Sequence, residues 1–217
     1  MTENLISLTL PGAFALLMQK PNGSKYHNSM APPVVAAAEL GELALRERVA
    51  LEGKKIHLRD TSPSGTEWVD HVLAELDKKT HHGNKPLGVH RWVSLRGNNI
   101  LRKHRDVLVG RELLDHEQDS VLGVPRNRYV PDAATRDGIL DEMHRATREE
   151  RCDDRLALLC SLVHASTAAS SLGFDRQERA KLEEISKGEA LATSVQQTVA
   201  VLTAVALAGA AASSGTS

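Results

Sequence analysis

Apolar residues recur along most of the chain with the three- and four-residue spacing of amphipathic helices. This spacing predicts helices over residues 34–53, 66–79, 101–114, 132–150, 156–171 and 176–187. A further apolar stretch, 199–212, is rich in alanine and carries no charge. It is shorter than the roughly twenty residues that a membrane span needs, so we expect a buried central helix there.

The helix expected at 34–53 has one apolar and one polar face. Its buried stripe consists of Val35, Ala38, Leu45 and Val49. Glu39 and Glu42 fall among the polar positions of the same helix, and Gly53 marks its expected end.

Two short stretches predict β-structure. Residues 54–59 alternate weakly and predict a short strand. Residues 121–130 hold two apolar runs around residues 125–128, which predicts a β-hairpin that turns there. Asp132 then has the position of a helix N-cap.

Composition narrows the fold class. The 217 residues suffice for one sizeable domain or at most two small ones. Aromatic residues make up only 3%, so the core is built from Leu, Val, Ile and Ala, which favours packed helices over a β-sandwich. Cys152 and Cys160 are too far apart along a helix, about 12 Å, to form a disulfide.

The 27 Lys and Arg residues nearly balance the 28 Asp and Glu residues, so we expect no nucleic-acid partner. The first ten residues lack the basic and apolar regions of a signal peptide, and a reducing cytoplasm is the simpler context. Walker A, Rossmann, GxSxG and HExxH patterns are absent, so no motif names a reaction. The ten histidines show no metal-ligand spacing, and we expect neither a metal nor another cofactor.

The strongest charge feature is a basic segment from Lys78 to Arg105. It contains eight Lys and Arg residues, four histidines and no acid. Such a segment creates a one-sided potential that suits phosphates, anionic headgroups or an acidic partner. The alternative is a solvated face that pairs with acids elsewhere, such as Glu112 and Asp115.

The candidate hairpin has an apolar tip flanked by arginines. Val121, Leu122 and Val124 are apolar, and Arg126 and Arg128 follow them. This tip suits shallow insertion into a bilayer, where the arginines meet phosphates. It suits docking onto a second copy of the chain equally well. A hairpin folded on the protein's own core is the third interpretation.

The order of several sequence blocks resembles the Golgi phosphoprotein 3 family. The blocks are LTLP (8–11), ELALRER (42–48), VALEG (49–53), LVGRELL (108–114), VLGVPRNRYVPD (121–132) and RLALLCSLVHAS (155–166). The GVPRNRY hairpin and the lack of an extended acidic N-terminal tail look like the bacterial (actinobacterial) branch. The resemblance implies one mostly α-helical domain over residues 1–212, with a central buried helix and a protruding β-hairpin, before a disordered tail at 213–217.

The resemblance also implies a function and a site. Eukaryotic members are peripheral membrane proteins that bind phosphatidylinositol 4-phosphate in a basic pocket. Its tryptophan position falls on His27, and its first arginine position falls on Ala36. Its Arg-x-x-Arg pair corresponds to Arg102 and Arg105, or includes Arg96 if two residues are inserted. The candidate headgroup-binding residues are therefore His27, Arg96, Arg102 and Arg105.

We thus expect a cytoplasmic protein, peripheral to the inner face of the plasma membrane. Its partner would be an anionic phospholipid or a phosphorylated small molecule, with homo-oligomerisation through the hairpin as a further option. The alternative is that the pocket serves a small molecule, in a binding protein or an enzyme of specialised metabolism. In that case Tyr26, His27 and Arg96 would line a mainly apolar cleft.

Overall fold

The computed structural model describes residues 8–26, 31–81, 86–97, 99–121, 124–149, 152–187 and 200. Its helices are α1 (Leu10–Leu17), α2 (Ala31–Leu45), α3 (Glu67–His81), α4 (Val89–Arg96), α5 (Ile100–Gly110), α6 (Ala133–Glu149), α7 (Asp154–Ala165) and α8 (Arg176–Lys187), with a 3₁₀ helix at Ala169–Leu172. Its strands are β1 (Val49–Glu52), β2 (Lys55–Leu58), β3 (Leu87–Gly88), β4 (Leu114–Val121) and β5 (Val124–Pro131). The mostly helical fold is confirmed.

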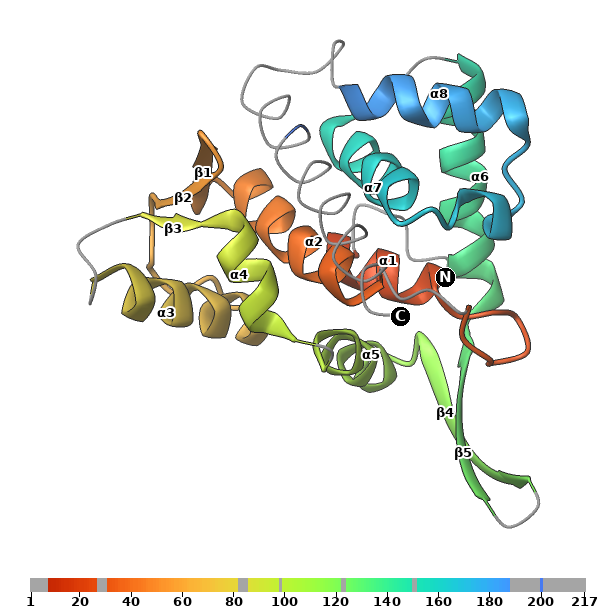
Figure 1. Ribbon diagram of the computed structural model, residues 1–217. Helices are drawn as coiled ribbons and strands as arrows, with labels where there is room; N and C mark the ends of the chain where they lie inside the picture. Colours follow the sequence, from red (N-terminus) through yellow and green to blue (C-terminus); the bar gives the residue numbers. More distant parts are fainter. Residues whose placement is uncertain are drawn as a thin grey trace, which may run out of the picture.

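Helices α1 and α2 lie at the centre of the described fold (Figure 1). Every residue of α1 is buried, as is most of α2. Helix α7 packs against both of them, and α4 and α5 pack against α2. The two helices that come from the basic segment therefore rest directly on the core.

The helix predicted at 34–53 is shorter than expected and ends at Leu45. Glu47 adopts a positive φ of 56°, and the Arg48 N–H donates to the Leu43 carbonyl at 2.9 Å. These features form a Schellman-type helix end without a glycine. Val49 therefore belongs to β1, which pairs antiparallel with the predicted strand β2.

The hairpin is longer than predicted and turns earlier. Strands β4 and β5 pair over eight residues each, from Leu114 opposite Pro131 to Val121 opposite Val124. Residues 125–128, where the turn was expected, therefore lie within β5. Opposite charges face each other across the ladder, with Glu117 opposite Arg128, which stabilises a register that the apolar pattern does not reveal. Figure 1 shows the hairpin protruding from the helices.

Two acids expected at polar positions are in fact buried. Glu39 and Glu42 expose 1% and 0% of their surface. Each is tolerated in the core because arginines from distant segments pair with it, Arg96 with Glu39 and Arg155 with Glu42. The pairing partners, rather than the local pattern, determine where these side chains lie.

Several sequence predictions lie outside the described residues. They are the central helix at 199–212, the tail at 213–217, and the positions of His27 and Leu122. None of the helices in the described ranges combines the length and apolar character of a bilayer-spanning segment.

The loop before α2 is anchored to the base of the hairpin. The Tyr129 N–H donates to the Gly23 carbonyl at 2.9 Å, and the Arg128 guanidinium donates to the Asn22 carbonyl. Gly23 has a φ of +77°, and a Cβ there would lie 2.8 Å from the Val130 Cγ2 atom. Only glycine fits this position without strain.

We expect Gly23→Ala to lower the free energy of unfolding by about 2–3 kcal/mol, because it adds a steric contact to an unfavourable φ. Gly53→Ala is the matched control, since Gly53 has a φ of +54° and no atom within 4 Å of the added methyl group. It should cost only about 1 kcal/mol. Urea unfolding measures both, and equal losses would show that the hairpin contact is unimportant.

Candidate functional site

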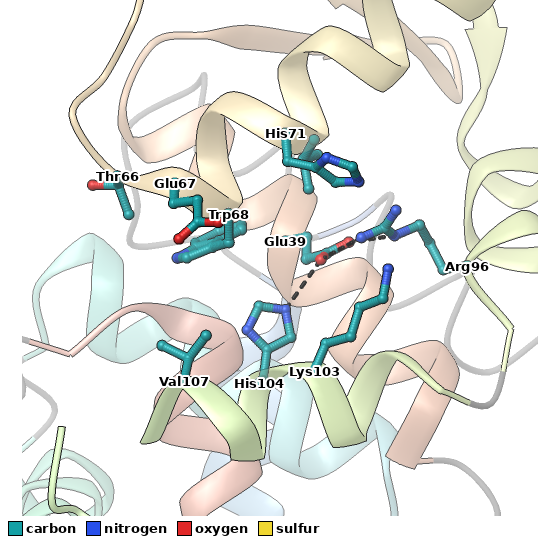
Figure 2. Close-up of a pocket in the computed structure, with 10 residues that line it drawn as sticks. Glu39, Thr66, Glu67, Trp68, His71, Arg96, Lys103, His104 and Val107 are labelled. Carbon is teal, nitrogen blue, oxygen red and sulfur yellow. Dashed lines mark hydrogen bonds and ion pairs between the residues drawn. The ribbon is translucent and has the colours of Figure 1, made fainter. Parts of the chain in front are cut away.

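A cavity of about 410 Å³ lies where α2, α3, α4 and α5 meet (Figure 2). It combines charged, aromatic and apolar side chains. The lining residues are Glu39, Thr66, Glu67, Trp68, His71, Val72, Arg96, Lys103, His104 and Val107.

The buried Glu39 carboxylate organises the inner wall of the cavity. Its Oε2 accepts from Arg96 Nε at 2.8 Å, and its Oε1 accepts from Arg96 Nη2 at 2.9 Å. The same Oε1 lies 3.0 Å from His104 Nε2. Arg96 and His104 expose only 5% and 3% of their side chains. A bidentate arginine and a histidine thus fix this carboxylate in place.

Arg96 is held on three sides. Its Nη1 donates to Glu75 at 2.6 Å, in addition to its two bonds to Glu39. Its guanidinium lies 5.0 Å from the ring centroid of the buried Trp92. Arg96 ends α4 just before Gly97, whose φ of +64° lets the chain leave the helix there. Arg96 therefore presents a rigid rather than a mobile charge to the cavity.

The outer wall comes from the first two turns of α3 and from α5. The Trp68 ring meets the His104 ring edge-on, with centroids 5.2 Å apart and an interplanar angle of 78°. His71 lies one turn further along α3, near the cavity mouth. Figure 2 shows the Lys103 side chain directing its amine into the cavity. Within the described residues, this amine forms no hydrogen bond or ion pair, so it is free to meet a ligand.

The structure separates the arginines that the sequence grouped together. Arg96 lines the cavity, whereas Arg102 lies on the exposed face of α5. Arg105 points toward the hairpin, 5.2 Å from the Tyr129 ring centroid. Burial lowers the pKa of Arg105, although nearby Tyr129 and Asp106 act against this. Two of its guanidinium nitrogens, Nε and Nη2, are buried and form no hydrogen bond in the described part of the chain.

The structure gives side-chain contacts for Arg128 on the hairpin, but only the strand register for Arg126. Arg128 lies 3.8 Å from Glu117 and also donates to the Asn22 carbonyl. Arg126 is placed only by register, opposite Asp119. Arg128 is thus engaged with the protein's own loop and strand.

Sequence reasoning missed five of the side chains that define the cavity, namely Glu39, Trp68, His71, Lys103 and His104. Lys103 belongs to the basic segment, so its charge was an available signal. Trp68 and His71 come from a helix outside that segment, and nothing in their local pattern connects them with α5. Glu39 carried no signal, because its partners are far away in the sequence.

These features define a mostly helical protein with a polar, partly basic cavity and a projecting two-stranded arm. The family model described as Golgi phosphoprotein 3 (GPP34) matches residues 10–202, and the chain belongs to this family. The family prediction is thus confirmed, while its bacterial branch stays a prediction. No curated protein matches the chain.

Proposed function

We propose that this protein associates peripherally with anionic membranes and binds a phosphate-bearing headgroup through the α4–α5 surface and its cavity. The observation that carries the proposal is the Lys103 amine, which has no partner among the described residues and is directed into a cavity that also holds Arg96 and two histidines. Membership of the Golgi phosphoprotein 3 family supports it. The inner face of the plasma membrane is the surface we propose.

The basic residues take different roles in this proposal. Lys103 supplies a flexible charge at the cavity, and Arg102 a second charge on the exposed face of α5. Arg96 uses three of its five N–H donors on Glu39 and Glu75, which leaves two for a ligand. Arg105 would act beside the hairpin base, and His27 would close the pocket from the loop before α2.

Exposed apolar residues accompany these charges. Leu95 on α4 and Val107 on α5 are large hydrophobic side chains that expose 48% and 41% of their surface. Arg91, also exposed, lies one turn before Leu95 on α4. Basic residues interspersed with exposed apolar ones suit contact with the headgroup region of a bilayer.

The hairpin has two proposed roles, shallow insertion and pairing with a second copy of the chain. Val121, Leu122 and Val124 would supply the apolar contact in either case. The ladder places acids on β4 opposite arginines on β5, so both free edges carry charge. Charged edges oppose unspecific strand pairing, and a partner would need a complementary edge.

The small-molecule alternative assigned Tyr26 to the cleft. Tyr26 is not among the residues that line this cavity, and its hydroxyl accepts a hydrogen bond from Arg136 at 3.4 Å. Arg96, which the alternative also assigned to the cleft, does line the cavity, and headgroup binding is the function that uses both Arg96 and the exposed α5 cations.

Replacing both exposed α5 cations tests the proposal. We expect Arg102→Glu/Lys103→Glu to weaken binding to vesicles containing phosphatidylglycerol by at least about 30-fold, because each basic residue near an anionic bilayer contributes about 1 kcal/mol. Vesicle co-sedimentation measures the change, with pure phosphatidylcholine vesicles as the uncharged reference.

Arg176→Glu/Arg179→Glu is the matched control. It makes the same change in net charge on the exposed face of α8, at a helix N-terminus that favours acids. Undiminished binding of the α5 variant would refute the proposed surface. An equal loss in the α8 variant would show that net charge alone governs binding.

A further inference from the structure

Without the histidines, the charged side chains around the cavity have a net charge that is not positive. Two cations, Arg96 and Lys103, face three carboxylates. The carboxylates are Glu39 on α2, and Glu67 and Glu75 on α3, the last through its bond to Arg96. The cavity therefore carries one surplus negative charge while its histidines are neutral. While the histidines are neutral, these carboxylates therefore offset the attraction that Lys103 offers to an anionic headgroup.

Two histidines line the cavity, and protons on them would change the sign of its net charge. His104 on α5 lies against Glu39, with Nε2 3.0 Å from the carboxylate. A proton on His104 is matched by the surplus carboxylate of the Glu39–Arg96–Glu75 cluster. His104 is thus a cavity histidine in direct contact with a buried carboxylate.

His71 on α3 is the second histidine that lines the cavity. It is exposed, and it lies four residues after Glu67 and four before Glu75 on α3. Side chains at this spacing share one helix face, so both carboxylates lie on the face of α3 that carries His71. Arg96 and Lys103 line the same cavity as His71. Protonating both histidines converts the surplus from one negative charge to one positive charge.

We propose that protons on His71 and His104 reverse the charge of this cavity and strengthen its hold on an anionic headgroup. This rests on the proposed function and adds a regulation to it: attachment to anionic membranes tightens as pH falls. Histidine is the side chain whose ordinary range of charge change lies between pH 5 and 8. The two histidines that respond to pH are themselves part of the proposed binding site.

The test compares vesicle binding at pH 8.0 and pH 5.5 at constant ionic strength. Phosphatidylglycerol is the probe, because its phosphodiester keeps its charge over this range. Two added charges near an anionic surface predict binding about 10- to 30-fold tighter at the lower pH. We expect His71→Gln and His104→Gln each to reduce this ratio, and the double variant to bring it close to one.

His57→Gln, a substitution of a half-buried histidine on β2 that does not line the cavity, is the control and should keep the wild-type ratio. Glutamine at 104 retains a donor for Glu39, and His71 is exposed, so His71→Gln tests the inference without disturbing the core. Absence of binding at both pH values would refute the proposed function. Binding with a ratio near one, or a double variant with the wild-type ratio, would overturn only the proton-dependent charge reversal.

Discussion

Glu42→Gln is expected to lower the free energy of unfolding by about 3–5 kcal/mol, the usual cost of breaking a buried ion pair. The Glu42 carboxylate is fully buried and meets four donors. Oε2 accepts from the Leu10 N–H at 2.8 Å and from Arg155 Nη1 at 2.8 Å. Oε1 accepts from Arg46 Nε at 2.8 Å and from Arg155 Nη2 at 3.1 Å. Glutamine keeps one acceptor oxygen and leaves the Arg155 charge unmatched.

This loss should depend on pH. Burial alone would raise the pKa of Glu42, but Arg155, the Leu10 N–H and Arg46 together hold it below the ordinary value of 4.5. A carboxylate with a lowered pKa stabilises the folded state above its unfolded pKa and ceases to do so as pH falls through its folded pKa. The difference between wild type and variant is therefore full near neutral pH and shrinks in acid, beginning below about pH 4.5.

Urea unfolding at neutral and acidic pH measures both effects. Glu184→Gln is the control, because Glu184 forms an exposed pair with Lys181 at 2.9 Å and should contribute less than about 1 kcal/mol. A Glu42 variant as stable as the control would mean that the network contributes little to folding.

Glu39→Gln is expected to change stability and binding in opposite directions. It removes a carboxylate that pairs with Arg96 and lies beside His104, so we expect a loss of about 3 kcal/mol in the free energy of unfolding. It also removes the surplus negative charge of the cavity. Binding to phosphatidylglycerol vesicles should therefore tighten about fivefold at pH 8.0.

Glu42→Gln serves as the matched comparison for binding. It makes the same substitution three residues along α2, at a side chain that does not line the cavity. It should lose stability without any gain in vesicle binding. Equal binding by the Glu39 and Glu42 variants would show that Glu39 does not restrain the ligand. A stability cost at a residue that shapes a site is a common feature of functional regions.

Local signals account for the elements that the sequence predicted well. Helix α8 has the predicted bounds, because Leu182 and Ile185 recur at helical spacing on one face and the remaining positions are mostly charged. Asp132 caps α6 as expected, with Oδ2 accepting from the Thr135 N–H at 2.7 Å. The end of α2 was not predictable in this way, because the positive φ of Glu47 is imposed where no glycine marks it.

The site was predictable only in part, because consecutive helical residues point in different directions. The basic segment predicted a site at Arg96 and α5, and in the structure Arg96 lines the cavity. Along α5, Lys103 faces the cavity, Arg102 faces solvent and Arg105 faces the hairpin. The sequence cannot show which residues of such a run converge until the packing of α3 and α2 against α5 is known.

The anchoring of the hairpin to the loop before α2 has a mechanical consequence. The hairpin is held near its base by two hydrogen bonds. Tyr129 donates to the Gly23 carbonyl, and Arg128 donates to the Asn22 carbonyl. A load on the hairpin, from a lipid or from another protein, would therefore reach this loop, whose Tyr26 N–H donates to the Met18 carbonyl at the end of α1 at 3.1 Å. Helix α1 also donates its Leu10 N–H to the buried Glu42 carboxylate at 2.8 Å, so hydrogen bonds connect the hairpin, the loop and α1 with the charged interior.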